Sequence, residues 1–267
     1  MVVSGLPAPR GVAGVIVREY DRARRRPRSA LVFADQEGGT ASTFDRLPPG
    51  RTASSYTSGG SAFRAGRAAG RSLRRAGVDV DLAPVLDLAG GPLGSRHFRR
   101  PGLGVAFARG LAAAGVGACA KHFPGLGTAR VSTDDSPRVH AVLRPAELAG
   151  FRAAVRTGVP CVMVSHAFYR GYGPYRASFA PKIYRRLRRT GFDGIAITDS
   201  LSVFGSRWTV LAARLAVRAG ADLILITSGP DARRAIRALV PLARRGRLDE
   251  RVARVLEFRH ALGLRSP

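Results

Sequence analysis

The sequence predicts a single α/β domain over residues 1–267, folded as a (β/α)8 barrel. Eight short apolar runs alternate with segments of helical spacing, and the runs are apolar throughout, as expected of parallel strands buried on both faces. The length of 267 residues also suits a barrel, which takes roughly 250 residues. A doubly wound open sheet is the alternative, but the glycine-rich phosphate loop that usually follows its first strand is missing.

The eight predicted strands are short runs rich in apolar and β-branched residues. They are MVVSGL (1–6), AGVIV (13–17), ALVFAD (30–35), VDVDLAP (78–84), VGACAKH (116–122), CVMVSH (161–166), GIAITDS (194–200) and DLILIT (222–227). Runs of four to eight such residues bounded by turn-forming residues are typical of strands. Eight of them in one chain of this size favour a closed barrel.

The helices are predicted from alanine-, leucine- and arginine-rich segments with helical spacing. They cover residues 61–77, 107–115, 145–158, 180–191, 210–220 and 231–246. Several of them end in glycine, which favours the C-terminus of a helix. The first two βα units are shortened, because the segment LPAPRGV after the first strand leaves too few residues for a full crossover helix.

The formal net charge of +26 raises the question of nucleic-acid binding. All but two of the 44 basic residues are arginines, the exceptions being Lys121 and Lys182. The arginines are spread along the whole chain, without an aromatic-interleaved basic motif, zinc-ligand spacing or a helix-turn-helix signature. We therefore expect solvated helix faces that attract polyanions weakly and in a salt-dependent way, and no specific nucleic-acid partner.

Cellular location and redox state are predicted from what the sequence lacks and from its two cysteines. No apolar run reaches the roughly 20 residues of a membrane span, and the start of the chain lacks the features of a signal peptide. Cys119 and Cys161 lie in apolar runs, so buried free thiols are expected rather than a disulfide. These features predict a soluble cytoplasmic protein without a membrane partner, which we expect to act as a monomer.

Ionisable side chains gather at the C-terminal ends of five predicted strands, which is where active sites of (β/α)8 barrels lie. They are Asp35, Asp87, Lys121 with His122, His166 and Asp199. A barrel with a purely structural role has no reason to place its few histidines and lysines there. The sequence therefore predicts that this rim is functional.

Three chemistries are compatible with the rim, and spacing alone does not decide among them. Facing carboxylates suit the cleavage of a glycosidic bond. Lys121 at a strand end suits a Schiff-base aldolase. His122 and His166 with a carboxylate suit a metal hydrolase, although the closely spaced histidine pair usual in zinc-binding barrels is missing.

Six local motifs distinguish among these alternatives. They are ADQEGGT (34–40), RLPPG (46–50), VDLAPVLDL (80–88), SRHF (95–98), AKHFPGLG (120–127) and FDGIAITDSL (192–201). With these motifs in this order, between about residue 30 and residue 226, the chain resembles family 3 glycoside hydrolases. It looks most like their single-domain β-N-acetylglucosaminidase (β-N-acetylhexosaminidase) branch.

The resemblance implies a role for each rim residue. Asp199, in ITDS, matches the family's catalytic nucleophile, which forms a covalent glycosyl-enzyme intermediate. The residues that match sugar ligands of the family are Asp35, Arg96, Lys121 and His122. His166 lies where the family often has AH at a strand end, and it either contacts the sugar or supports its neighbours. Asp87 is expected to bond loop backbone near the rim.

The loop after KHFPG departs from the family pattern. In the acetylglucosaminidase branch this loop typically reads H-G-D-T and then D-S-H, and the aspartate and histidine of D-S-H form the acid/base dyad. Here Leu126 replaces the first histidine, and Pro137 stands in place of the dyad histidine. Asp135 of the motif remains and is the predicted catalytic acid; Asp134 and His140 are the alternatives, unless general-acid help is missing altogether.

The resemblance implies a retaining exo-β-glycosidase that hydrolyses β-N-acetylglucosaminides from cell-wall (peptidoglycan) fragments. The expected partner is a small carbohydrate, and the reaction needs no metal or organic cofactor. Thr40 and Thr43 stand where the family tends to have arginines, one of them a substrate ligand. The identity of the sugar therefore rests on fewer matched residues than the reaction class does. The alternative is a catalytically impaired family member that binds or senses a sugar.

Overall fold

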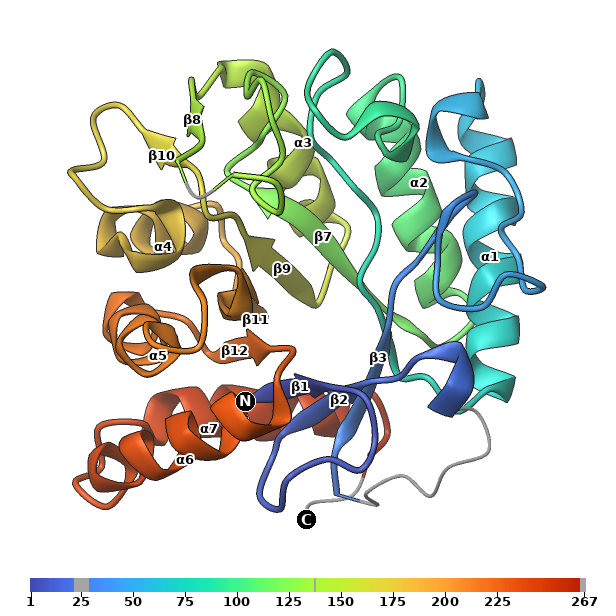
Figure 1. Cartoon of the computed structure of the whole chain (residues 1–267). Coiled ribbons are helices and arrows are strands. Elements are labelled where there is room, and N and C mark those ends of the chain that lie inside the picture. The colour runs from blue at the N-terminus through green and yellow to red at the C-terminus, as the bar shows by residue number, and fades with distance from the viewer. Residues whose placement is uncertain (22–28, 137, 265–267) are drawn as a thin grey trace.

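A computed structural model describes residues 1–21, 29–136 and 138–264 (Figure 1). Eight parallel strands close into a barrel in the order β1-β12-β11-β9-β7-β6-β3-β2, which confirms the predicted (β/α)8 fold class. The strands are β1 Val2–Ser4, β2 Gly14–Ile16, β3 Leu31–Ala34, β6 Val80–Asp81, β7 Gly117–Phe123, β9 Cys161–Val164, β11 Ile195–Ser200 and β12 Leu223–Ile226. Each overlaps one of the eight runs predicted as strands.

Seven α-helices occur in the described part of the chain. They are α1 Gly59–Arg75, α2 Pro101–Ala112, α3 Pro145–Arg156, α4 Pro181–Arg188, α5 Thr209–Ala219, α6 Gly229–Ala243 and α7 Asp249–Ala261. Five of the six predicted helices agree within three residues at each end, whereas α2 begins at Pro101 rather than at residue 107. Proline at the first helical position is favourable, and Gly104 allows α2 to approach Leu86 and Phe98 closely. No helix in these described ranges is long and apolar enough to cross a membrane.

The first two βα units are shortened, as predicted. Residues 5–13 join β1 to β2 through turns alone. The described part of the β2–β3 connection contains only the short 3₁₀ helix Glu19–Asp21. Asp21 is fully buried, and its carboxylate accepts hydrogen bonds from the backbone N–H groups of Leu6 (3.1 Å) and Arg18 (3.0 Å). This carboxylate therefore ties the two short connections together.

Side chains on the strands alternate between the barrel interior and the layer beneath the helices, as the two-residue period of a strand requires. The interior is filled by Val2, Ile16, Leu31, Phe33, Val80, Leu82, Cys119, Cys161, Met163, Ile195, Ile197, Leu223 and Leu225. Phe258 of α7 belongs to the same buried cluster. Helix α7 therefore closes the N-terminal end of the barrel, opposite the rim where the predicted site lies.

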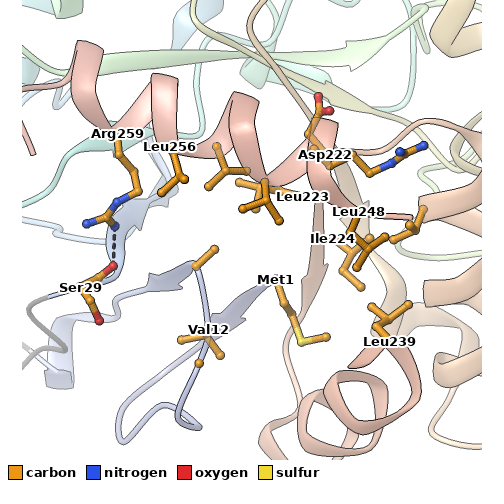
Figure 2. Close-up of a pocket in the computed structure, with 16 residues that line it drawn as sticks. Met1, Val12, Ser29, Asp222, Leu223, Ile224, Leu239, Leu248, Leu256 and Arg259 are labelled. Atoms are coloured by element: carbon orange, nitrogen blue, oxygen red, sulfur yellow. Dashed lines mark hydrogen bonds between the residues drawn. The ribbon is translucent and has the colours of Figure 1, made fainter. Parts of the chain in front are cut away.

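Helix α7 was not predicted, and two polar contacts with distant segments hold it. Arg254 pairs with Asp222 before β12 through Nε and Oδ1 (2.7 Å), and Asp222 also accepts the backbone N–H of Ala196 (2.8 Å). Arg259 donates to the carbonyl of Ser29. A cavity of about 380 Å³ lies beside α7 and is lined mainly by apolar side chains (Figure 2).

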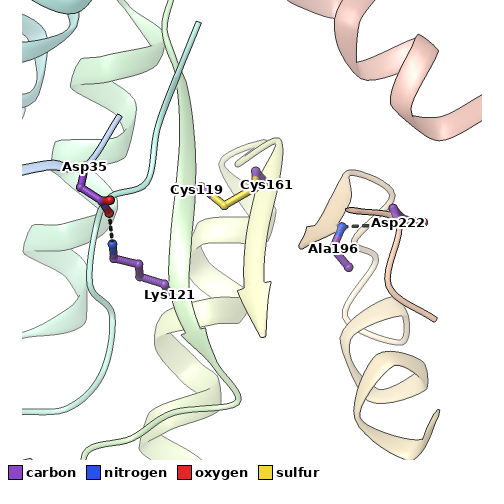
Figure 3. Close-up of a disulfide and its surroundings, with 6 residues drawn as sticks. All are labelled: Asp35, Cys119, Lys121, Cys161, Ala196 and Asp222. Carbon is purple, nitrogen blue, oxygen red and sulfur yellow. Dashed lines mark hydrogen bonds and ion pairs between the residues drawn. A yellow bond between two sulfur atoms is a disulfide. The ribbon is translucent and has the colours of Figure 1, made fainter. Parts of the chain in front are cut away.

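The two cysteines form a disulfide inside the barrel, so the prediction of free thiols was wrong (Figure 3). Cys119 on β7 and Cys161 on β9 are register partners of adjacent parallel strands, with Cα atoms 4.3 Å apart. Both are fully buried. The apolar run around each cysteine predicted its burial, but only the pairing of two strands separated in sequence places the sulfur atoms opposite each other.

Candidate active site

A buried network of charges lies at the C-terminal ends of β3 and β7. Lys121 Nζ is 2.8 Å from Asp35 Oδ1 and 2.7 Å from Glu37 Oε1, and Figure 3 shows the lysine reaching across to Asp35. Arg96 holds Glu37 with two bonds of 2.8 Å. The Lys121 and Glu37 side chains are 3% and 4% exposed, whereas that of Asp35 is 34% exposed. Asp35 is therefore the member of this network most open to a substrate.

The charges of this network stabilise one another. Burial alone would raise the pKa of Glu37, but Lys121 and Arg96 lower it to about 2. Burial would likewise lower the pKa of Lys121, but Asp35 and Glu37 raise it above its ordinary value. Lys121 thus keeps its proton at neutral pH. A protonated amine is a poor nucleophile, so this geometry disfavours the Schiff-base alternative.

Two residues of the network were missed by the sequence analysis. Glu37 is two residues beyond Asp35 in β4 (Gln36–Gly38), so the two-residue period of a strand could have placed both carboxylates on the same side. Asp81 lies fully buried beneath them and accepts the backbone N–H of Gln36 (2.9 Å). Burial raises the pKa of Asp81 to about 8, so this carboxyl is mainly protonated at neutral pH.

His122 is oriented by Asp87, as expected of a structural aspartate near the rim. His122 Nδ1 and Asp87 Oδ2 are 2.8 Å apart, and Asp87 also accepts the backbone N–H groups of His122 (3.1 Å) and Leu126 (2.6 Å). With Nδ1 donating to Asp87, Nε2 of the ring is left for a substrate. Asp87 therefore fixes both the imidazole and the start of the loop that follows β7.

Asp199 lies near the end of β11 with its side chain partly exposed. Its Oδ1 accepts the backbone N–H of Ser200 (2.8 Å). Burial would raise the pKa of Asp199, but His122, His166 and the Ser200 N–H lower it below the ordinary value. Asp199 is therefore ionised at neutral pH, as a carboxylate nucleophile must be.

His166 supports the backbone beside Asp199. The imidazole is buried, with Nδ1 2.8 Å from the Ser178 hydroxyl and Nε2 3.0 Å from the carbonyl oxygen of Ser200. Burial lowers the pKa of His166, so the ring is neutral, donating from Nε2 and accepting at Nδ1. Both nitrogens are occupied by protein partners, which favours the supporting role over direct contact with a sugar.

The three candidate proton donors occupy different surroundings in the loop after β7. The charge of Asp134 interacts with Asp199, and partial desolvation together with this neighbouring negative charge raises the pKa of Asp134. Asp135 is exposed in a turn, where its backbone N–H donates to the carbonyl of Ser132 (3.2 Å). His140 is exposed in β8 (His140–Ala141), and its ring stacks on Phe168 at a centroid distance of 5.2 Å.

The environment of the loop therefore favours Asp134 over Asp135 as the acid. Two carboxyl groups whose surroundings shift their pKa values in opposite directions suit the roles of proton donor and nucleophile. Among the described residues, no group of three or more histidine, cysteine, aspartate or glutamate side chains is placed to hold a metal ion. His122 bonds to Asp87, and His166 bonds to Ser178 and Ser200. These contacts favour hydrogen-bonding roles for the two histidines.

Comparison with known proteins points to one family. Residues 14–258 match the N-terminal domain of glycosyl hydrolase family 3. A β-hexosaminidase from Thioalkalivibrio sulfidiphilus is 36% identical over 245 residues, which cover 81% of this chain and 69% of the relative.

Solved structures of that family superpose on nearly the whole chain. For the family 3 β-N-acetylglucosaminidase of a Paenibacillus species, the TM-score is 0.87 at 26% identity, covering 98% of this chain and 61% of that chain. For a family 3 member from Mycobacterium smegmatis, the TM-score is 0.83 at 26% identity, covering 96% of this chain and 89% of that chain. The chain thus spans less than two thirds of the Paenibacillus protein and most of the mycobacterial one.

Proposed function

This chain belongs to glycosyl hydrolase family 3, and from that membership we propose that it is a retaining exo-β-N-acetylglucosaminidase. The observation that carries the proposal is the arrangement of one rim: ionised Asp199, the sugar-binding network of Asp35 and Lys121, and Asp134 interacting with Asp199. The names of the curated relative and the Paenibacillus structure support the choice of a β-linked N-acetylhexosamine. Peptidoglycan fragments are the proposed source of that sugar.

In the first step, Asp199 attacks the anomeric carbon while the bond from that carbon to the leaving oxygen breaks. Asp134 gives its proton to the leaving oxygen, and the sugar is left as an ester of Asp199. In the second step, Asp134 takes a proton from water, which attacks the same carbon and releases Asp199. Two inversions at one carbon retain its configuration.

Binding of the sugar is assigned to the fixed charges of the rim. Asp35 is half-exposed and ion-paired to Lys121, so it can accept hydrogen bonds from sugar hydroxyl groups without losing its charge. His122 offers Nε2 because Asp87 occupies Nδ1. Arg96 is held by Glu37, and 29% of its side chain remains exposed.

The proposal is tested with 4-nitrophenyl N-acetyl-β-glucosaminide and the matching β-glucoside, whose leaving group needs little protonation. We expect turnover of the first substrate by the wild type, release of the β-anomer as the first product by NMR, and loss of turnover in Asp199→Asn. Release of the α-anomer would contradict the retaining mechanism. Turnover that survives in Asp199→Asn would contradict the assignment of the nucleophile.

The second candidate is a barrel that binds the sugar without hydrolysing it. The exposure of the Asp134 side chain, together with Pro137 in place of the dyad histidine, favours this candidate. It predicts that folded wild-type protein binds N-acetylglucosamine in calorimetry but turns over neither aryl glycoside.

A further inference from the structure

Glu147, in the first turn of α3, is a buried carboxylate outside the rim network. Its side chain is 0% exposed, and its Oε2 accepts the backbone N–H of Leu88 (3.3 Å). Oε1 faces the backbone of Gly127, and it has no hydrogen-bond partner within the described residues. Burying a carboxylate costs free energy. Its position between the segments at Leu88 and Gly127 therefore indicates a structural role.

The backbone at Gly125 and Gly127 packs directly against the Glu147 side chain. A methyl group added to Gly125 would lie 2.3 Å from Oε2 of Glu147, and one added to Gly127 would lie 2.6 Å from Oε1. A methyl group on Gly91 would lie 2.8 Å from the Cα of Gly127. Both distances to Glu147 are shorter than any van der Waals contact, so only glycine fits at these two positions without a shift.

Residues 125–127 are also held by Asp87 and Tyr169, and Asp87 contacts the candidate site residue His122 as well. Asp87 accepts the backbone N–H of Leu126 (2.6 Å) and also orients the ring of His122. The Tyr169 hydroxyl donates to the carbonyl of Gly125 (2.7 Å). Residues 125–127 are therefore held by Asp87, Tyr169 and Glu147, just before the loop that contains Asp134.

We propose that Glu147 is a positioning residue, which holds residues 125–127 so that His122 and the loop bearing Asp134 keep their places at the rim. The carboxylate acts through backbone contacts with Leu88 and Gly127 and does not touch the substrate. This inference rests on the proposed function, because the placement of the loop matters for catalysis only if the loop supplies the acid.

The charge of Glu147 should make this anchoring depend on pH. Burial raises the pKa of Glu147 to about 7, with a further increase from Asp87, while the N–H group of Leu88 and the charge of Arg144 oppose the shift. The Tyr169 hydroxyl faces the same region and is neutral, because burial raises its pKa. Because the closed arrangement raises the pKa of Glu147 from its ordinary value of 4.5, it favours the protonated carboxyl, so the loop should loosen as the pH rises towards about 7 and Glu147 ionises.

The structural arm of the test measures amide hydrogen exchange of residues 125–129 at pH 6 and pH 8 in the wild type, Glu147→Gln and Glu257→Gln. Glu257 is exposed on α7 and serves as the matched control. We expect protection in the wild type to fall between the two pH values after correction for the intrinsic rate. In Glu147→Gln this fall should vanish, because an amide does not ionise in this range, and exchange should be about tenfold faster at both pH values, equivalent to the loss of one acceptor for a backbone N–H.

The catalytic arm uses a methyl β-glycoside, whose leaving oxygen needs a proton, beside the nitrophenyl substrate. Glu147→Gln should lower kcat/KM for the methyl glycoside about tenfold, with kcat/KM for the nitrophenyl substrate nearly unchanged, and should remove a limb of the pH profile near 7. Unchanged exchange, or lost protection with unchanged kcat/KM and pH profile, would overturn the proposal.

A second variant keeps the test decisive if Glu147→Gln does not fold. Gly127→Ala leaves the carboxylate charged and displaces the loop from the other side, so it should reproduce the lost protection and the selective fall in kcat/KM. Failure of the wild type to hydrolyse any aryl glycoside would instead refute the proposed function, while the exchange data would still decide whether Glu147 holds the loop.

Discussion

Two parts of the rim differ in burial: the charged network at the strand ends is mostly buried, whereas the aspartates of the loop after β7 are exposed. The strand-end network of Asp35, Glu37 and Lys121 is mostly buried, and its charges are satisfied by ion pairs of 2.7 and 2.8 Å. The loop after β7 presents Asp134 and Asp135 with exposed side chains. The loop is tied to its surroundings at its two ends, where the Thr128 hydroxyl bonds the backbone of Val142 (2.7 and 3.0 Å) and the Phe168 N–H donates to the carbonyl of Val139 (2.8 Å).

With the roles proposed above, this difference would separate substrate binding from proton transfer. Groups that only hold a substrate can be fixed by buried ion pairs, because their charge does not change during the reaction. A group that gives and then takes a proton needs a pKa near the working pH, which the strong charges of the network would prevent. At Asp134, desolvation and the negative charge of Asp199 outweigh the opposing charges of Arg96 and Lys121, so its pKa rises.

The largest expected effect comes from removing the nucleophile. Asp199→Asn keeps the shape of the side chain but loses the negative charge, so kcat/KM for both aryl glycosides should fall by about 10⁴-fold or more. Circular dichroism should show an intact fold, since within the described residues the partly exposed Asp199 side chain accepts a hydrogen bond only from the Ser200 N–H. Steady-state kinetics measures the loss, and a fall of less than tenfold would exclude Asp199 as nucleophile.

The next effect tests the buried network through stability. Lys121→Met removes the cation between Asp35 and Glu37 and should destabilise the protein by about 3–5 kcal/mol, the usual cost of breaking a buried ion pair. Lys182→Met, at an exposed position on α4, is the control and should change stability by less than about 0.5 kcal/mol. Urea unfolding measures both. Equal effects would mean that the network contributes nothing to the fold.

The loop is tested by a matched pair of neighbouring aspartates. Asp134→Asn should lower kcat/KM for a methyl β-glycoside by about 10²–10⁴-fold, the usual contribution of a general acid, with a much smaller loss of kcat/KM for the nitrophenyl substrate. Asp135→Asn should behave like the wild type. Kinetics on both leaving groups, with azide added to rescue Asp134→Asn, measures the difference. A larger loss in Asp135→Asn would return the role to the residue that the sequence favoured.

The smallest expected effect is the contribution of Asp81 to the pH dependence of the free energy of unfolding. Its pKa is about 8 in the fold against an ordinary value of 3.8, so the folded state binds one more proton than the unfolded state between these values. Stability should therefore fall as the pH rises, by roughly 3 kcal/mol between pH 5 and pH 7 from this group. Asp81→Asn should flatten that slope, and Asp193→Asn, on the surface, should not. Urea unfolding at the two pH values measures it.

Most of the fold could be predicted from the sequence, because uninterrupted apolar runs and helical spacing are local signals. The runs at 116–122 and 194–200 identified β7 and β11, together with Lys121 and Asp199 at their ends. Helix α7 was missed because its burial depends on the N-terminal end of a barrel assembled from distant segments. The Cys119–Cys161 bond was missed for the same reason, because neither apolar run by itself determines the register between β7 and β9.

The site could be predicted in part. Asp35 and Lys121 were identified by motif, and the structure pairs them at 2.8 Å. Glu37 was overlooked although it stands in the same motif, because a carboxylate that only pairs with cations has no signal of its own. The choice between Asp134 and Asp135 depends on which side chain interacts with Asp199, and adjacent residues in a loop carry no periodicity that would decide it.

The disulfide has a consequence for how the protein responds to proteolysis. It closes the chain between Cys119 and Cys161 into a covalent ring, with a sequence separation of 42. The whole loop with Asp134 lies within this ring, and so do the exposed arginines Arg130 and Arg138. A single tryptic cut at either arginine would open the ring and leave both halves of the barrel joined. The nicked protein would migrate as one chain until a reductant separates it into two.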